Sequence, residues 1–152
     1  MKPIRLFLSL TIFFLVSCEK DETNSVKGLT DGFCIVVNDK VVLNHTEIDY
    51  YDFSEHEIYL KNDNPFFEAP VSGETFTIYA DMVSVYSGYI LSSASSYLPT
   101  GAVIYTDPFL QKNNTIAIGC IIITDEFGNS DKDPRNDKRI IEALKKYNQF
   151  HE

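Results

Sequence analysis

Apolar residues alternate with polar ones in several short runs of this chain, and this period of two limits the fold more than any other feature of the sequence. Such alternation is typical of β-strands, whose successive side chains point to opposite faces of a sheet. The clearest runs cover residues 33–43, 56–61 and 74–88. Asn38-Asp39, which tolerate a positive φ, and Asp81-Met82 divide two of these runs, so we expect two tight β-hairpins.

The run TIAIGCIIIT, residues 115–124, differs from the others because both of its faces are apolar. Strands that are covered on both sides have this composition. We therefore expect residues 115–124 to form a central strand of the sheet.

One helix is predicted, over residues 134–149 at the end of the chain. Asp133 suits the N-cap and Pro134 the first helical position. Ile140 and Leu144 lie at the spacing of one helix face, which would place an apolar stripe on a sheet.

These signals together predict one domain over residues 31–152, mainly β, with one C-terminal α-helix. The strands number six or seven, and they would form either a single β-sandwich or an open antiparallel sheet. An immunoglobulin-like sandwich is compatible with this pattern, although the chain contains no Trp.

The first residues have the pattern of a secretory signal peptide. Lys2 and Arg5 form a cationic start, and residues 6–18 carry no formal charge. This run is shorter than the roughly 20 apolar residues that a membrane-spanning helix needs. It ends in Leu15-Val16-Ser17-Cys18, which resembles the lipobox of bacterial lipoproteins.

The lipobox resemblance implies that residues 1–17 are removed, that the Cys18 sulfur carries a diacylglyceryl group and that the new amino terminus is acylated. Several fatty acyl chains together would anchor the protein stably to a membrane. The alternative is an ordinary signal peptide with a cysteine near its cleavage site.

Four charged residues follow the lipobox: Glu19, Lys20, Asp21 and Glu22. They look like the acidic export segment of Bacteroidota-type lipoproteins, which implies an outer-membrane protein facing the cell surface. An anchor facing the periplasm is the alternative. From composition, residues 18–30 are expected to be a flexible acidic tether, because they cannot bury enough apolar surface to become ordered.

The chain is acidic, with a net charge of −9. Removal of residues 1–17 would take away Lys2 and Arg5 but no acidic residue, and would make the charge two units more negative. A surface of this charge repels phosphate backbones, so nucleic acid is excluded as a partner class.

Two cysteines remain after Cys18, namely Cys34 and Cys120, each in an apolar strand pattern. In an oxidising compartment they could form a disulfide, which would close a long loop. The alternative is a pair of reduced, buried thiols that pack as small apolar side chains.

The segment HTEIDYYDFSEHE, residues 45–57, mixes carboxylates with aromatic side chains. Asp49, Tyr50, Tyr51 and Asp52 are its candidate ligand-binding residues, because aromatic rings flanked by carboxylates suit sugar binding. A pair of carboxylates at a suitable separation could also hydrolyse a glycoside. The alternative is a strand whose tyrosines pack and whose acidic residues face water.

The loop before the predicted helix offers a second candidate site. Asn129, Asp131 and Asp133 have a spacing that could present three oxygens to calcium, the one cofactor we consider. An EF-hand is excluded, because Pro134 and Ile140 stand where that motif requires glycine and glutamate. Helix capping is a sufficient alternative role for Asp133.

No catalytic constellation of a known type occurs in the sequence. The leading hypothesis is therefore a membrane-anchored, non-enzymatic binding module that contacts a glycan or an envelope protein. An immunity or inhibitor lipoprotein that neutralises a toxin or hydrolase is the second hypothesis, and a steering role of the negative charge would support it. A small hydrolase that uses Asp49 and Asp52, or Asp131 and Asp133, is the third.

Overall fold

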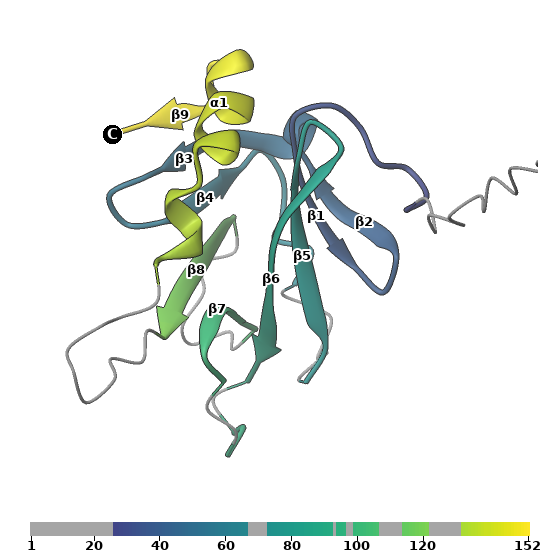
Figure 1. Ribbon diagram of the computed structural model, residues 1–152, viewed down its shortest axis with the longest axis vertical. Helices are drawn as coiled ribbons and strands as arrows, with labels where there is room; N and C mark the ends of the chain where they lie inside the picture. The colour runs from purple at the N-terminus through teal and green to yellow at the C-terminus, as the bar shows by residue number, and fades with distance from the viewer. Residues whose placement is uncertain (1–25, 67–72, 93, 97–98, 107–113, 122–131) are drawn as a thin grey trace, which may run out of the picture.

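The computed structural model describes residues 26–66, 73–92, 94–96, 99–106, 114–121 and 132–152. These residues form a mainly β protein with one C-terminal α-helix, as the sequence predicts (Figure 1). The strands are β1 (Phe33–Val37), β2 (Lys40–Asn44), β3 (Ile48–Asp52), β4 (Glu57–Leu60), β5 (Thr75–Ala80), β6 (Val83–Leu91), β7 (Gly101–Tyr105), β8 (Thr115–Ile121) and β9 (Phe150–His151).

The nine strands form one open sheet in the order β2-β1-β5-β6-β7-β8-β4-β3-β9. An open sheet is one of the two predicted architectures, but it has nine strands instead of six or seven. It is also mixed instead of purely antiparallel, because β6 pairs with β7 and β3 pairs with β9 in parallel. The additional strands include β9, which has only two residues and is too short for a period to show.

Both predicted hairpins are confirmed. Asn38 and Asp39 have φ values of 49° and 58° and join β1 to β2. Asp81 and Met82 have φ values of 47° and 65° and join β5 to β6. Positive φ at both central residues gives the turn the twist of its flanking strands, so these two dipeptides fix the register of the hairpins.

The central strand is confirmed as well. Strand β8 lies between β7 and β4, near the middle of the sheet, and its Ile116 and Ile118 are fully or almost fully buried. On the other face, Ala117, Gly119 and Ile121 are only partly buried, so β8 is covered less completely on that side than predicted. Residues 122–124 of the predicted strand lie outside the described residues.

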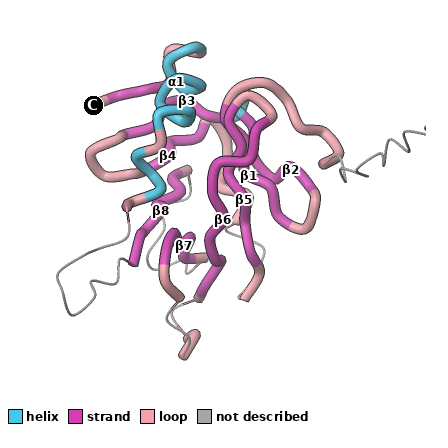
Figure 2. Tube along the Cα trace, in the orientation of Figure 1, coloured by secondary structure: helices cyan, strands magenta, loops and turns pink. Residues whose placement is uncertain are grey.

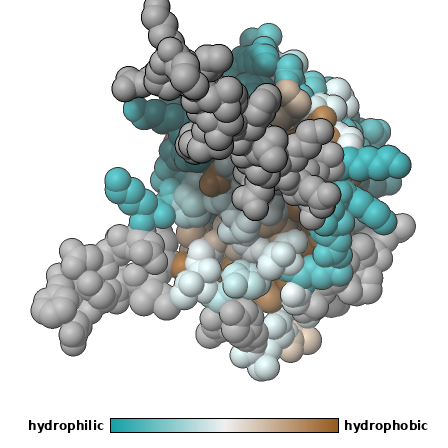
Figure 3. Space-filling view, turned by 45° about the vertical axis from the view of Figure 1, so that its right-hand side comes forward, coloured by the Kyte–Doolittle hydropathy of each residue, from teal (hydrophilic) through white to brown (hydrophobic). Residues whose placement is uncertain are grey.

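The sheet curls around one hydrophobic core, so side chains from both of its ends contribute to the same cluster. Leu43 comes from the edge strand β2, and Tyr51 comes from β3 near the opposite edge. Phe76 on β5 and Ile104 on β7 come from strands between them. Among the described residues visible in Figure 3, hydrophilic and intermediate colours predominate, whereas hydrophobic residues (brown) form small patches. The alternation of the sequence thus separates a buried inner face from a largely polar outer face.

Two helical segments replace the single helix predicted over residues 134–149. A 3₁₀ turn, η2, covers Pro134–Asn136, and the α-helix α1 covers Lys138–Lys146. They are separate because Asp137 between them is extended, with φ −66° and ψ 130°, and caps α1 by accepting a hydrogen bond from Arg139 N.

Helix α1 (Figures 1 and 2) contacts β1 and β5 as well as β9. Its Ile140 and Leu144 side chains belong to the core. After the helix, the chain turns at Asn148, which has φ of 56°, and continues into Gln149. Its Nε2 donates to the carbonyl oxygens of His45 and Ile48, each at 2.6 Å. Backbone hydrogen bonds from Tyr51 N to Gln149 O at 2.7 Å and from Phe53 N to His151 O at 2.9 Å then pair β9 with β3.

Candidate functional site

Strand β3 carries all four of the candidate ligand-binding residues, but the alternation of the strand divides them between two faces. Tyr51 points inward and is 2% exposed, whereas Tyr50 and Asp52 lie on the outer face. Asp49 is exposed and lies at an irregularity in the pairing of β3 with β4. The structure therefore does not bring the four residues into one cleft.

Tyr50 instead belongs to a stack of rings across three strands. Its ring lies 4.3 Å from that of Tyr59 on β4 and 4.5 Å from that of His151 on β9, centroid to centroid. The ring planes differ by only 12° and 17°. Tyr50 and Tyr59 are direct cross-strand partners, so the register of β3 and β4 produces the first of these contacts.

Two carboxylates lie next to this stack on the same outer face. Asp52 and Glu57 are direct partners in the β3–β4 pairing, and Asp52 is also the partner of His151 in the β3–β9 pairing. We call this group of five residues the outer patch: Tyr50, Asp52, Glu57, Tyr59 and His151.

Hydrogen bonds shift the pKa values of Asp52 and Tyr59 in the outer patch. Asp52 Oδ1 accepts from the Ser54 hydroxyl at 2.7 Å, and this bond holds the pKa of Asp52 below its usual value. The Tyr59 hydroxyl donates to Glu57 Oε2 at 2.9 Å, which raises the pKa of Tyr59 to about 12. At neutral pH the Asp52 carboxylate is therefore charged and the Tyr59 phenol is neutral.

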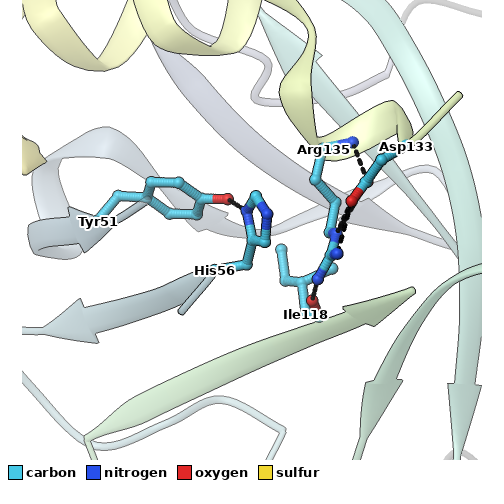
Figure 4. Close-up of polar contacts among 5 residues, drawn as sticks. All are labelled: Tyr51, His56, Ile118, Asp133 and Arg135. Atoms are coloured by element: carbon cyan, nitrogen blue, oxygen red, sulfur yellow. Dashed lines mark hydrogen bonds and ion pairs between the residues drawn. The ribbon is translucent and has the colours of Figure 1, made fainter. Parts of the chain in front are cut away.

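A second polar cluster lies on the inner side, around Tyr51. Its hydroxyl is 2.7 Å from Nδ1 of His56, a residue of the β3–β4 turn with φ of 54° (Figure 4). Burial raises the pKa of Tyr51 and lowers that of His56. The phenol therefore keeps its proton and donates it to a neutral imidazole, and we assign the imidazole proton to Nε2.

Asp133 and Arg135 of the η2 segment lie beyond His56 in Figure 4. The Arg135 guanidinium donates from Nε to Asp133 Oδ1 at 2.9 Å and from Nη2 to Oδ2 at 2.6 Å. Its Nη1 donates to the carbonyl oxygen of Ile118 at 2.8 Å. This side chain thus ties the η2 turn to strand β8.

These contacts give Asp133 a role in the fold. Both of its oxygens accept from Arg135, which holds its pKa below the usual value, and Oδ1 also accepts from Arg135 N. The positive charge bound by the Asp133 carboxylate is therefore the Arg135 guanidinium. Asn129 and Asp131, the other proposed calcium ligands, lie outside the described residues, as does the Asp131 of the hydrolase hypothesis.

In the described part of the chain, no group of three or more His, Cys, Asp or Glu residues could hold a metal ion.

Cys34 and Cys120 are not joined to each other in the structure, and Cys34 is buried whereas Cys120 is partly exposed. They face different surroundings, because Cys34 Sγ donates to Thr30 O at 3.6 Å, whereas the Cys120 thiol lies near Asp133. Burial first, and then the Asp133 charge, raise the pKa of Cys120. A raised pKa keeps the thiol protonated and unreactive.

The lipobox residues Leu15 to Cys18 and the charged segment Glu19 to Glu22 lie outside the described residues. Among the residues that are described, no helix is long and apolar enough to cross a membrane.

Sequence reasoning missed three residues of the outer patch, namely Glu57, Tyr59 and His151, and two of the inner cluster, namely His56 and Arg135. The pairing of Tyr50 with Tyr59 could have been found, because a short turn joins two alternating runs there. His151 could not, since its position depends on a parallel pairing at the sheet edge.

We compared the chain with known proteins: no family model, no curated protein and no solved structure matches it.

Proposed function

We propose that the protein is a lipid-anchored lipoprotein of the outer membrane whose folded domain is a non-enzymatic binding module facing the cell surface. The anchor is argued from the cationic start, the uncharged run and the lipobox that ends in Cys18. The partner would be a glycan or a protein of the envelope.

The observation that carries the binding role is the outer patch. Its rings are partly or fully exposed at the surface, and they lie on paired strands. Aromatic side chains on a rigid sheet supply contact area at little cost in conformational entropy. The polar residues of the inner cluster, by contrast, are engaged with one another and tie elements of the fold together.

The anchor is tested by labelling cells with a radioactive fatty acid. We expect label on the wild type and none on Cys18→Ser. Equal labelling of the two would contradict the anchor. Protease treatment of intact cells then tests the surface location, and complete protection of the protein would favour the periplasmic face.

The binding role is tested by recovering partners from envelope extract with the wild type and with Tyr50→Leu. The matched control is Tyr79→Leu, which removes another half-buried tyrosine on β5 of the same sheet. We expect Tyr50→Leu to lose partners that Tyr79→Leu retains. Identical recovery by both variants would remove the outer patch from the proposal.

A second candidate is an immunity or inhibitor lipoprotein for a basic toxin or hydrolase. The net charge of −9 and the paired carboxylates Asp52 and Glu57 favour it. A toxin or hydrolase gene next to the gene for this protein would support this candidate, and inhibition of the encoded enzyme by the purified protein would test it.

A further inference from the structure

We propose that the turn between β5 and β6 inserts the side chains of Met82 and Val83 into the surface of the membrane to which the protein is anchored. This inference rests on the proposed lipid anchor at Cys18 and adds a second membrane contact, made by the folded domain itself. It is argued from the exposure of the two side chains, the backbone conformation of Met82, and the surroundings of the turn.

Met82 and Val83 are the large apolar side chains that are exposed in the described part of the chain, at 55% and 54%. They are neighbours at one end of the β5–β6 hairpin, and we call this pair the hairpin tip. Specific protein interfaces involve about 20–30 residues on each side, and the hairpin tip is too small for one. Insertion into a membrane surface has no such minimum, because its strength scales with the apolar area buried.

The backbone of Met82 is a second, independent observation. This residue has φ of 65° at the second central position of the turn, where glycine is usual. A long side chain at positive φ costs conformational energy, and the exposed Met82 side chain recovers little of it by packing within the protein. The other hairpin turn has positive φ at Asn38 and Asp39, which tolerate it. Strain at an exposed apolar residue points to a role outside the fold itself.

The hairpin tip lies beside the segment that connects the domain to the anchor. Gly32 N donates to Asp81 Oδ1 at 2.8 Å, and Asp81 N donates to Gly32 O at 2.9 Å, so the β5–β6 turn lies next to the loop that leads into β1 (Figure 1). A fully extended chain from Cys18 to Val26, the first described residue, spans at most about 29 Å. The anchor therefore keeps the domain close to the membrane and raises the effective concentration of the hairpin tip there.

Basic side chains flank the hairpin tip. Lys146 Nζ lies 3.0 Å from Asp81 Oδ1, and Arg139 Nη1 donates to Ser84 O at 3.3 Å. Asp81 and Ser84 are the residues directly before and after the hairpin tip. Long basic side chains at the edge of an apolar insertion can keep their charged ends at the level of the lipid headgroups. Lys146 also offsets the negative charge of Asp81, which would otherwise repel anionic lipid.

The test uses the lipid-anchored protein, purified and reconstituted into phosphatidylcholine vesicles. Because the chain contains no Trp, a single introduced Trp reports on its own position. Val83→Trp places this reporter at the hairpin tip, and Ser87→Trp, at an exposed position further along β6, is the matched control. We expect the emission of Val83→Trp to shift to shorter wavelength and to lose about half of its intensity when the lipids carry brominated acyl chains. The emission of Ser87→Trp should change much less.

Substitution of Met82 separates strain from membrane contact. Met82→Gly suits the positive φ and should raise the melting temperature by about 2–4 °C. In the Val83→Trp background it should reduce the quenching about twofold, because much of the apolar surface of the hairpin tip is lost. The matched control is Asn38→Gly, which replaces an uncharged residue of positive φ in the other hairpin turn and should leave the quenching unchanged. Circular dichroism shows that each variant is folded.

Three results would overturn the proposal while leaving the anchor in place, for protein that floats with the vesicles. The first is quenching that is equal in Val83→Trp and Ser87→Trp, or absent from both. The second is a shift of Val83→Trp emission that grows with protein density and is not quenched, which would place the hairpin tip against a second copy of the chain. The third is a lower melting temperature of Met82→Gly, which would give the side chain a role in the fold.

Failure of the anchor gives a different result. Protein that does not float with the vesicles would contradict the anchor, and with it the inference drawn from it. Fatty acid labelling of the wild type and of Cys18→Ser tests that step separately.

Discussion

At the scale of single residues, His56 is constrained in both its backbone and its side chain. It has a left-handed backbone conformation, its Nδ1 accepts from the Tyr51 hydroxyl, and its carbonyl oxygen accepts from Ile118 N at 3.1 Å. A side chain at positive φ costs conformational energy unless its surroundings hold it there. The hydrogen bonds from β3 and β8 supply that support.

The neutral state of His56 predicts a pH dependence of stability. Burial, followed by the Arg135 charge, lowers its pKa in the folded protein below the usual value near 6.5. Between those two pKa values the unfolded chain binds more protons than the folded one, so stability falls as the pH decreases below about 6.5. We expect the melting temperature to fall between pH 8 and pH 5, measured by circular dichroism.

The control for this prediction is His56→Asn, because Asn tolerates positive φ but does not titrate. We expect its melting temperature to depend less on pH over the same interval. Parallel curves for the two proteins would show that His56 is not the group responsible.

The two arginine–aspartate pairs of the C-terminal segment test how burial changes the contribution of an ion pair to the free energy of unfolding. The side chains of Arg135 and Asp133 are 16% and 15% exposed, and those of Arg139 and Asp137 are 48% and 30% exposed. Arg135→Met leaves a largely buried carboxylate and the Ile118 carbonyl without their donor, and should cost about 2–3 kcal/mol. Arg139→Met, the exposed counterpart, should cost less than about 1 kcal/mol.

Urea denaturation of both variants measures these free energies of unfolding. Equal losses for Arg135→Met and Arg139→Met would contradict the view that Arg135 ties η2 to β8. This pair of variants also separates burial from residue type, since each removes an Arg two positions after its Asp.

At the scale of elements, the start of α1 depends on Asp137. Its side chain accepts from Arg139 N at 2.9 Å and pairs with the Arg139 side chain, which lowers its pKa to about 2. Asp137→Ala should destabilise the protein by about 1 kcal/mol, because an N-cap is lost. Asp137→Asn keeps the cap and should cost about half as much or less.

The same cap predicts a second pH effect, at lower pH than that of His56. A carboxylate with a depressed pKa contributes stability that is complete above its unfolded value near 3.8 and is lost as the pH falls towards 2. In urea denaturation at pH 7 and pH 2.5, the difference between wild type and Asp137→Asn should shrink at the lower pH. If the difference in free energy of unfolding were the same at both pH values, the lowered pKa of Asp137 would not contribute to stability.

The elements that could be predicted are those with local causes. Alternation and two turn dipeptides were sufficient for the hairpins β1–β2 and β5–β6, and an apolar run was sufficient for β8. Strand β9 could not be predicted, because two residues show no period and its pairing with β3 joins residues about a hundred positions apart. The same is true of the candidate site, where contacts between distant parts of the chain could not be predicted.

Within that site, Tyr50 and Asp52 could be selected from composition. The separation of Tyr51 from them followed from strand alternation, but it required knowing that residues 48–52 form a strand. His151 and Arg135 depend on contacts between distant parts of the chain, which local patterns do not report.

At the scale of the whole molecule, the sheet has two antiparallel parts joined by one parallel pairing. Strands β2, β1, β5 and β6 form the first part, β7, β8, β4 and β3 form the second, and β6 pairs with β7 between them. Parallel neighbouring strands need a crossover connection. The alternation of apolar and polar residues does not predict the parallel pairing of β6 with β7, because a strand shows the same alternation in either direction. The core is continuous across this junction, so the junction keeps both parts around one interior.

Gly88 lies at this junction, as the partner of Ala102 in the β6–β7 pairing. A Cβ at position 88 would collide with the Ala102 carbonyl oxygen and with the ring of Phe76, which is fully buried. Gly88→Ala should therefore force the two parts of the sheet apart and cost more than about 2 kcal/mol, because a packed core cannot absorb the added methyl group.

Gly119→Ala on β8 is the matched control, since its Cβ would meet Tyr105 and Val103 O only at 3.6 and 3.7 Å, which is ordinary contact. This substitution should be neutral or slightly stabilising, because alanine restricts the unfolded chain more than glycine does. The measurement is the free energy of unfolding of both variants in urea. Similar values for Gly88→Ala and Gly119→Ala would mean that the β6–β7 pairing tolerates separation, and that the two parts of the sheet are held together by the core alone.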